Sequence, residues 1–458
     1  MDIGTISLIL LIGIFVLLAI GMPLGFASGF MAVAVLVMKF GPDLLFRSFG
    51  TGPLNILAQR MYGLMTDYVL ISVPLFIFMA CLMERSGIAR TMFDSLNIWL
   101  SRTRGGIAIV TAVMAIIMAA MSGIIGGEVV LLGLIALPNM LRLGYNQNLA
   151  IGTICASGSL GTMIPPSIVL IIFGLVTDTS IHALFKAAFV PGFILGGCYI
   201  VYIIIRTRLN PELAPLPEGG DGVTMADKLR ALPGLLAPLA VVFVVLGSIY
   251  GGITGITEAA GMGCVAVLLL ITLRGEMSWA LFKDSLMRTW KSTGTILWIT
   301  FGATALAGAY SIAGGPTYVA NLIVGADLPT MGILLVMMLI FLFLGAIMDW
   351  VGIVLLVMPV FLPIILKLPI EEIGLTGALV AAPSFVAVWF GILFCVNMQV
   401  SFLSPPFGPA AFYLKSVAPP HITLPDIFRG FLPFIGIQLI VLMLVLLFPE
   451  VTMLFAPR

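Results

Sequence analysis

The sequence predicts an all-α polytopic membrane protein of two inverted repeats, each with five crossings, one of them broken by a double proline, and one re-entrant helical hairpin. Composition is the first observation: 61% of the 458 residues are hydrophobic and 9% are charged, against about 25% charged in a soluble domain. Length is the second, because a crossing helix needs about 20 apolar residues, which leaves room for about a dozen segments and no sizeable aqueous domain. The third is an order of motifs that occurs twice.

Apolar stretches follow one another along the whole chain, with a mean hydropathy of +1.22. Backbone groups in hydrocarbon must pair within their own segment, which predicts helix for nearly all of these stretches. The first one follows Asp2 and no basic residue, whereas a secretory signal starts with a basic region, so we expect a retained first helix. The stretches are 6–21, 22–38, 69–83, 105–121, 129–141, 149–177, 187–205, 233–250, 256–273, 293–312, 331–344, 350–366, 373–416 and 430–448.

One long hydrophilic connector, Arg206–Arg230, interrupts the apolar pattern and is rich in proline and glycine. We interpret it as a loop between two halves. The predicted organisation is therefore a first repeat over 1–205, a connector over 206–232 and a second repeat over 233–458.

The two halves carry matching motifs in the same order. SGIIGGEVVLLGLIALP (Ser122–Pro138) resembles FLGAIMDWVGIVLLVMP (Phe343–Pro359), an alignment that sets Glu128 opposite Asp349. Farther along, IPPS matches SPPF, and FKAAFVPG matches FRGFLPF. Repeated halves are typical of secondary transporters, whose site lies near mid-membrane where the repeats meet. Chance similarity between apolar helices is the alternative.

Two arms in each half are too short to cross the membrane comfortably. The arms of segment 105–141 flank Ser122 and a run of glycines, and segment 329–367 repeats this pattern around Gly345 and Asp349. Short arms around a glycine-rich tip predict a re-entrant hairpin. Such a hairpin is stable at membrane depth only where it lines a cavity or packs on protein.

The next long run of each half, 146–178 and 372–416, is predicted to be a helix broken by a double proline. A proline lacks an N–H and displaces the carbonyl four residues earlier, so each pair should release two carbonyls. Free carbonyls at half-helix ends suit a Na⁺ ion, and half-helix N-termini suit a carboxylate. The prolines are Pro165, Pro166, Pro405 and Pro406, and the released carbonyls belong to Gly161, Thr162, Ser401 and Phe402.

The distribution of positive charge sets the predicted orientation. With the N-terminus outside, fifteen of the 21 Lys and Arg residues fall on the inner side, and the opposite orientation leaves six there. An odd number of crossings, five, inverts the second half. Both termini are therefore expected outside.

Residues 43–66 and 278–291 mix apolar and charged side chains and occupy equivalent places in the two halves. This composition predicts two amphipathic helices that lie in the membrane surface. They either brace a fixed scaffold or serve as ordinary interfacial anchors.

Several function classes are excluded by the sequence. The 21 Lys and Arg balance 20 Asp and Glu, which gives no basis for a nucleic-acid surface. No zinc-protease, serine-hydrolase or phosphate-loop motif is present, so we expect neither an enzyme nor an ATP-driven pump. The cysteines stand alone in apolar runs and are expected to pack rather than to bind metal; they are Cys81, Cys155, Cys198, Cys264 and Cys395.

Five motifs together resemble the large membrane subunit of the tripartite ATP-independent periplasmic (TRAP) transporters, the DctM-like family, and the resemblance runs through nearly the whole chain. The motifs are MERSGIARTMFDSL (Met83–Leu96), GGEVVLLGLIALPNMLRLGY (Gly126–Tyr145), ICASGSLGTMIPPSI (Ile154–Ile168), GAIMDW (Gly345–Trp350) and SFLSPPFGPAAFYL (Ser401–Leu414).

The resemblance implies an elevator-type carrier of the ion transporter superfamily in the bacterial inner membrane, where the count above places both termini on the periplasmic side. Such a carrier imports organic acid anions by symport with sodium. The resemblance also implies two partners, a small four-helix membrane subunit and a soluble periplasmic substrate-binding protein.

Two motifs depart from the family's pattern. The second double-proline motif commonly is TPPxG, whereas this chain has Ser404 before the prolines and Phe407 after them, and Ile124 stands where a second serine is common. The run Ala381–Gly391 also lengthens the segment before the second double proline. This lengthening resembles a subgroup whose binding proteins take oxo- and hydroxy-monocarboxylates.

Two Na⁺ sites are predicted, with Asp349 as the best single candidate. An ionisable group within the membrane costs at least about 2.5–3.5 kcal/mol, which favours a bound cation; a structural ion pair or a helix cap is the alternative. Serines within helices alternatively bond the carbonyl four residues earlier. The first site comprises Ser122, Gly123, Gly161 and Thr162, and the second Gly345, Asp349, Ser401 and Ser404.

Glu128 retains three possible roles: ion ligand, proton acceptor or helix cap. For the substrate carboxylate we expect Ser157, Ser159 and Ser167, together with backbone N–H groups after the helix breaks. No Lys or Arg falls within a predicted tip, so the sequence shows no arginine clamp.

The predicted function is the large permease subunit of a Na⁺-coupled, binding-protein-dependent importer of carboxylates, embedded in membrane lipid. The hairpins and broken helices would move as one body against a scaffold of 1–84, 233–312 and the amphipathic arms. One alternative is a single-component carboxylate carrier coupled to Na⁺ or H⁺. Another is a passive channel or a non-transporting membrane scaffold.

Overall fold

The structure, a computed structural model, describes residues 1–458 with the exception of 47–51, 101–102, 124–125, 217–223, 326–327 and 456–458. Every regular element within the described ranges is helical. The α-helices of the first half are α1 (Ile3–Ala19), α2 (Leu24–Phe40), α3 (Asp43–Phe46), α4 (Pro53–Met65), α5 (Ser72–Arg85), α6 (Ile88–Leu100), α7 (Gly106–Ser122), α8 (Gly127–Arg142), α9 (Gln147–Gly158), α10 (Ile168–Thr177) and α11 (Ile181–Leu209). Short 3₁₀ helices are η1 (Tyr68–Ile71), η2 (Leu160–Thr162) and η3 (Pro211–Leu213).

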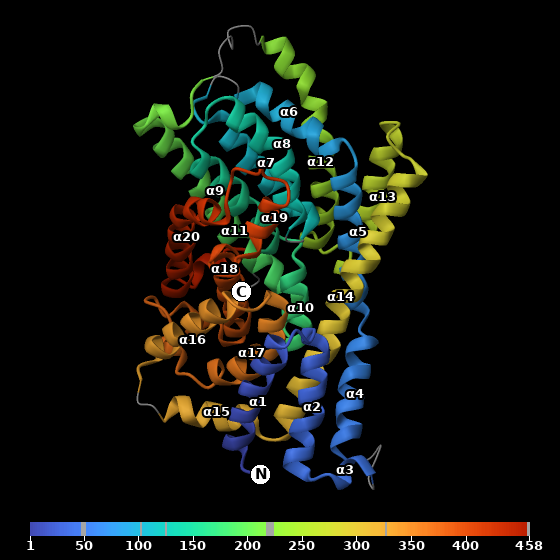
Figure 1. The fold of residues 1–458 in the computed structure, drawn as a ribbon, viewed down its shortest axis with the longest axis vertical. Helices are drawn as coiled ribbons and strands as arrows, with labels where there is room; N and C mark the ends of the chain where they lie inside the picture. Colours follow the sequence, from blue (N-terminus) through green and yellow to red (C-terminus); the bar gives the residue numbers. More distant parts are fainter. Residues whose placement is uncertain (47–51, 101–102, 124–125, 217–223, 326–327, 456–458) are drawn as a thin grey trace.

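The second half also contains both long and short helices. Its α-helices are α12 (Met225–Tyr250), α13 (Ile256–Leu273), α14 (Trp279–Ile312), α15 (Gly315–Val324), α16 (Thr330–Gly345), α17 (Trp350–Ile365), α18 (Val386–Leu403), α19 (Pro409–Lys415), α20 (Leu424–Leu447) and α21 (Glu450–Met453). Its 3₁₀ helices include η5 (Ile370–Glu372), η6 (Ala378–Ala381) and η7 (Pro383–Phe385). The body is elongated, with α6 near one end and the N-terminus and α3 at the other (Figure 1).

The prediction of a separate surface helix over 278–291 is wrong. Helix α14 continues without interruption from Trp279 to Ile312, 34 residues in all, which is about 51 Å at 1.5 Å per residue. A change from mixed to apolar composition does not end a helix, because its backbone hydrogen bonds continue until a cap or a proline intervenes. In the first half, by contrast, α4 ends at Met65 and Asp67 caps η1.

The loop between the halves is shorter than the predicted Arg206–Arg230, because α11 continues to Leu209 and α12 starts before Arg230. Helix α12 begins at Met225, because Thr224 and Asp227 form a capping box. The Asp227 N–H donates to Thr224 Oγ1 at 3.3 Å, and the Thr224 N–H donates to the Asp227 carboxylate at 2.9 Å. The sequence signal for this start is the Thr-x-x-Asp spacing.

The second broken helix starts later than the predicted residue 372. The turns η5, η6 and η7 precede α18, which begins at Val386. Gly374 and Gly377 adopt positive φ angles of 74° and 66°, and Pro383 follows them. These backbone conformations are incompatible with a continuous helix, although the stretch is apolar.

Helix α18 lies at the centre of the packed body. In an apolar 18-residue stretch long enough to cross a membrane, 94% of α18 is buried inside the protein, whereas the corresponding share for α12 is 33%. It packs against α16, α20 and α11, and the Trp389 indole N–H donates to the Val445 carbonyl at 2.9 Å. Seven helices in the described part of the chain are long and apolar enough to cross a membrane, and α18 is the most enclosed of them.

The second arm of each hairpin packs against the second arm of the broken helix in the other half. Helix α8 contacts α19, and α17 contacts α10. The two hairpins themselves, α7 with α8 and α16 with α17, are also packed pairs. Residues far apart in the sequence are thereby brought to one region, between α10, α17 and α14 (Figure 1).

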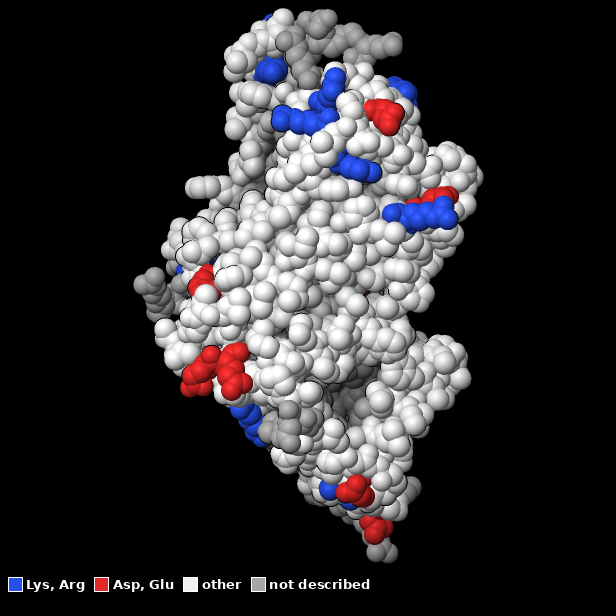
Figure 2. Space-filling view, turned by 90° about the vertical axis from the view of Figure 1, so that its left-hand side faces the viewer, with Lys and Arg blue, Asp and Glu red and all other residues white. Residues whose placement is uncertain are grey.

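Charged side chains are unevenly spread over the surface. On the face shown in Figure 2, most Lys and Arg lie toward one end, a few others lie near Asp and Glu toward the opposite end, and the surface between is mostly uncharged. A membrane-embedded face requires such an uncharged band.

Candidate functional site

The first hairpin tip packs directly on the first helix break. Helix α7 ends at Ser122, and Gly123 follows in the left-handed conformation with φ +58°. The Ile168 N–H, at the start of α10, donates to the Gly123 carbonyl at 3.3 Å. A Cβ on Gly123 would overlap the Pro166 carbonyl oxygen. Only glycine satisfies both the backbone conformation and the space.

The second tip contacts the second break in the corresponding way. A Cβ on Gly345, the last residue of α16, would overlap the Ser401 hydroxyl of α18. Gly345, Asp349 and Ser401 together line a cavity of about 10 Å³, about the space for one water-sized sphere. The structure therefore brings three of the four residues predicted for the second site to one cavity. Ser404 is not among the lining residues.

Asp349 occupies the N-cap position of α17, yet its side chain makes no capping hydrogen bond. The residue is exposed, and no described Lys, Arg or His forms an ion pair with it. The structural ion pair that the sequence left open is thus not formed within the described ranges. The carboxylate faces the small cavity and the larger cleft described below.

The serines of the second site bond to their own helix. Ser401 Oγ donates to the Asn397 carbonyl at 3.1 Å, and Ser404 Oγ donates to the Val400 carbonyl at 2.8 Å. The Ser401 carbonyl accepts the Ser404 N–H at 3.2 Å. The prediction that this carbonyl is left unpaired is therefore wrong, because the chain turns tightly enough after α18 for a residue three positions on to reach it.

The first break is also more fully hydrogen-bonded than predicted. The Thr162 carbonyl, expected to be free, accepts Ser167 Oγ at 2.5 Å, because the irregular backbone around Pro165 and Pro166 brings Ser167 back toward η2. The Thr162 hydroxyl donates to the Ser159 carbonyl at 3.0 Å. It also accepts a hydrogen bond from Gln399 Nε2 of α18.

Glu128 lies in the first turn of α8 and is 1% exposed. Its Oε1 accepts a hydrogen bond from the Ser122 hydroxyl, which joins the two arms of the first hairpin. Its Oε2 has no hydrogen-bond partner among the described residues. A Cβ on the adjacent Gly127 would overlap the carboxylate of Glu84, at the end of α5, so the tip also touches the neighbouring helix.

A cleft of about 380 Å³ lies where both tips, both helix breaks and α14 meet. Its walls include polar groups from several elements, and among them are Asp349, the hydroxyls of Ser292 and Thr295 on α14, and Tyr413 on α19. The lining residues are Gly123, Thr162, Ile168, Ser292, Thr295, Ile296, Asp349, Trp350, Val351, Phe402, Phe407, Pro409 and Tyr413.

Sequence reasoning missed Ser292, Thr295 and Tyr413. The available signal for the first two was the hydroxyl-rich run Ser292–Thr295 inside a long apolar helix. The three serines predicted for substrate do not line the cleft; they are Ser157, Ser159 and Ser167. All three are buried, and Ser167 caps α10 through the Leu170 N–H at 3.5 Å.

Metal chemistry based on acidic or sulfur ligands has no support in the described residues, which contain no group of three or more His, Cys, Asp or Glu side chains able to hold a metal ion. The five cysteines are all free, and four of them are buried.

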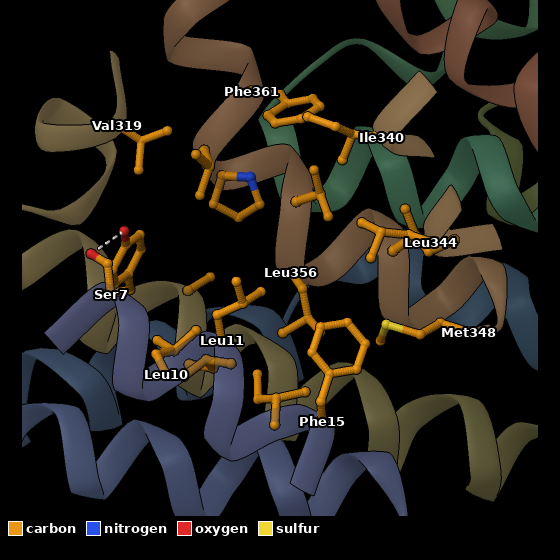
Figure 3. A pocket seen from close by; sticks show the side chains of 18 residues that line it. Ser7, Leu10, Leu11, Phe15, Val319, Ile340, Leu344, Met348, Leu356 and Phe361 are labelled. Atoms are coloured by element: carbon orange, nitrogen blue, oxygen red, sulfur yellow. Dashed lines mark hydrogen bonds between the residues drawn. The ribbon is translucent and has the colours of Figure 1, made fainter. Parts of the chain in front are cut away.

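A second cavity, of about 310 Å³, lies between α1, α14 and the second hairpin (Figure 3). Leu10, Phe15, Leu356 and other apolar side chains project into it. One polar feature in its lining is the pair of hydroxyls on Ser7 and Tyr310, which are 2.7 Å apart and already hydrogen-bonded to each other. A charged solute would find no charged partner among the described residues here, so the cleft at the tips is the better candidate site.

Comparison with known families decides the assignment. The family model described as "Tripartite ATP-independent periplasmic transporter, DctM component" matches residues 11–451. The chain belongs to this family. This DctM component is thus a multi-pass membrane transport protein rather than an enzyme.

The names of proteins related to this DctM component mention different substrates. The C4-dicarboxylate TRAP transporter large permease protein DctM of Pseudomonas aeruginosa is 30% identical over 422 residues, which cover 92% of this chain and 91% of that one. The isethionate TRAP transporter permease protein DctMQ of Oleidesulfovibrio alaskensis is 26% identical over 97% of this chain and 66% of its own length. The sialic acid TRAP transporter large permease protein SiaM of Vibrio cholerae is 27% identical over 96% and 95%.

Two solved transporters share the fold of this DctM component. The Alcanivorax borkumensis YdaH transporter superposes with a TM-score of 0.58 at 14% identity, over 95% of this chain and 98% of that one. Neisseria gonorrhoeae MtrF superposes with a TM-score of 0.60 at 11% identity, over 92% and 94%. At these identities the likeness concerns the fold alone.

Proposed function

We propose that this DctM component is the large permease of a Na⁺-coupled importer that receives an organic acid anion from a periplasmic binding protein. The observation that carries the proposal is the cleft of about 380 Å³ lined by both hairpin tips, both helix breaks and α14. In secondary transporters with inverted repeats, substrate and ion sites lie at such broken elements. The bacterial inner membrane is the corresponding location, with both termini on the periplasmic side.

The two proposed Na⁺ sites would be built from residues that line this cleft or adjoin it in the chain. At the second tip, Gly345, Asp349 and Ser401 surround a cavity large enough for one small ion. At the first, Gly123 and Thr162 line the cleft wall, with Ser122 and Gly161 next to them in the chain. A Na⁺ ion beside Asp349 would neutralise the carboxylate and allow an anion to bind in the same cleft.

An anion would bind in this cleft without a basic residue, because the described residues of its lining include no Lys or Arg. The N–H groups of Trp350 and Val351, in the first turn of α17, have no intrahelical acceptor. Both residues line the cleft at the positive end of the helix dipole, which suits a carboxylate. The hydroxyls of Ser292, Thr295 and Tyr413 are additional donors.

Movement of the tips against a fixed scaffold is the transport step that this arrangement supports. The cross-packing of α8 on α19 and of α17 on α10 ties both hairpins and both broken helices into one body, consistent with two inverted repeats. The proposed scaffold includes α14, which contacts α2 and α5, and α13, which contacts α5. Among the described lining residues, the scaffold side chains all come from α14, so an elevator-type movement would slide the tips along it.

Two partners belong to this proposal, a small membrane subunit and a periplasmic binding protein. Trp279 and Trp290 are 76% and 78% exposed and lie in the N-terminal half of α14. They offer an apolar surface for the small subunit in addition to membrane lipid.

The test is a pair of measurements on purified protein and its Asp349→Asn variant. Thermal unfolding in NaCl is compared with unfolding in equal KCl or choline chloride, because a ligand at about 100 times its Kd adds about 2.7 kcal/mol. Uptake of radiolabelled C4-dicarboxylates and monocarboxylates is then measured in proteoliposomes with and without a Na⁺ gradient, the binding protein and the small subunit.

The proposal predicts a Na⁺-specific stabilisation that Asp349→Asn removes, and uptake that requires the gradient and both partners. Uptake without partners would favour a single-component carrier. Flux without any gradient would favour a passive channel, and the absence of both ion binding and flux would favour a scaffold.

A further inference from the structure

Gln399 is a buried amide whose hydrogen bonds are incomplete. It lies on α18, six residues before Pro405, and is 0% exposed. Its Nε2 donates to Thr162 Oγ1 of the first break, whereas its Oε1 has no partner within the described part of the chain. Exchange of the amide nitrogen and oxygen would leave the nitrogen unpaired instead. A buried polar atom without a partner is costly, and the amide contacts Thr162, which lines the cleft, so a ligand that enters the cleft can reach the unpaired oxygen.

The surroundings of Gln399 select a small cation rather than an anion. The Thr162 hydroxyl donates its single proton to the Ser159 carbonyl at 3.0 Å, so its lone pairs face the remaining neighbours. Helix α18 has no charged residue from Val386 to Leu403, and neutral oxygens without a charged partner suit a Na⁺ ion. Thr162 also lines the cleft, so an ion that reaches Thr162 from the cleft is next to the Gln399 amide.

We propose that Gln399 Oε1 is a ligand of the first cation site, beside Thr162, while Nε2 keeps its hydrogen bond to Thr162 Oγ1. This inference rests on the proposed Na⁺-coupled function and extends it. The ion would then be held by both halves of the chain, through Thr162 of the first half and Gln399 of the second. Ser401 of the second site lies two residues farther along α18, so loading of one site would bias the geometry of the other.

The test is a Na⁺ titration of the thermal unfolding midpoint at constant ionic strength, with choline as the replacement cation. The variants are Gln399→Leu, which removes both polar atoms, and Gln399→Glu, which keeps an oxygen but removes the N–H donor. The matched control is Gln438→Leu, because Gln438 is also 0% exposed, donates Nε2 to Tyr199 at 2.8 Å and leaves Oε1 without a described partner.

We expect Gln399→Leu to raise the half-saturating Na⁺ concentration about tenfold or more, the scale of one lost hydrogen bond to a charged group. Gln399→Glu should bind Na⁺ more tightly than the wild type, and Gln438→Leu should match the wild type. If Gln399→Leu does not fold, Gln399→Glu decides: a half-saturating Na⁺ concentration below that of the wild type supports the ligand role, and an equal or higher one overturns it.

Two results would overturn the inference while leaving Na⁺ coupling in place. An unchanged titration for Gln399→Leu would mean that the amide does not reach the ion. A rise for Gln399→Glu equal to that for Gln399→Leu would mean that Gln399 only positions Thr162 by donating its N–H. A wild-type protein that does not respond to Na⁺ at all would overturn the proposed function itself and this inference with it.

Discussion

Replacing Gly123 by alanine should separate the first hairpin tip from the first helix break. Gly123 adopts φ +58°, and its carbonyl accepts the Ile168 N–H at 3.3 Å. A Cβ at this position would overlap the carbonyl oxygen of Pro166, which belongs to the backbone and cannot rotate away as a side chain would. The substitution therefore strains the tip and the break together.

The size of the effect follows from these two contributions. A left-handed conformation costs a non-glycine residue about 1–2 kcal/mol, and forcing an extra carbon into a packed site costs about 1–3 kcal/mol. Together they destabilise the docked tip by about 2–5 kcal/mol. Even the lower figure is roughly a 30-fold change in the docking equilibrium.

The assay is the thermal unfolding midpoint of the purified variant with and without NaCl. Gly197→Ala is the matched control, because Gly197 lies within α11 and no heavy atom approaches within 4 Å of the place that an alanine Cβ would occupy. Alanine there should be neutral or stabilising by up to about 1 kcal/mol. We expect Gly123→Ala to unfold at a lower temperature and to lose its response to Na⁺. Equal midpoints and equal Na⁺ responses for the two variants would refute this account of the tip.

Three further outcomes can be checked in the same preparations. Ser292→Ala with Thr295→Val should raise the KM for uptake about tenfold, the scale of one or two lost hydrogen bonds, and leave the Na⁺-dependent midpoint unchanged; a normal KM would remove these hydroxyls from the site. Glu128→Leu should destabilise the protein by about 1–3 kcal/mol, because it leaves the buried Ser122 hydroxyl unpaired, whereas Glu128→Gln should keep most of the stability; denaturation curves for both test this. Trp389→Phe should lower stability by about 1–3 kcal/mol, since a buried carbonyl of α20 loses its donor, and a wild-type melting curve would contradict that role.

Helix positions were largely predictable because hydrocarbon leaves the backbone no alternative to internal hydrogen bonds. The errors lie at boundaries where hydropathy and backbone geometry disagree. Met225 starts α12 because of a capping box inside a polar segment, and the apolar stretch from residue 373 does not become α-helical until Val386, after two glycines with positive φ.

Part of the candidate site was also accessible from sequence. Glycine-rich tips and double prolines mark local breaks, and local breaks are visible in the chain order of residues. Gly345, Asp349 and Ser401 could therefore be grouped before their shared cavity was seen. The carbonyl of Thr162 could not be judged in this way, because its partner Ser167 reaches it only through the irregular backbone between them.

The sequence by itself determined that this protein is an all-helical membrane protein with two helices broken at double prolines, because composition, length and proline chemistry act locally. Only the tertiary structure decided which groups share a site. Ser292 lines the cleft, and the Gln399 amide donates to Thr162. Both side chains belong to helices that lie more than a hundred residues after the first tip in the sequence. Contacts of this kind depend on how helices pack against one another, and in an apolar chain nearly every helix face is equally hydrophobic and so leaves the packing partner unspecified.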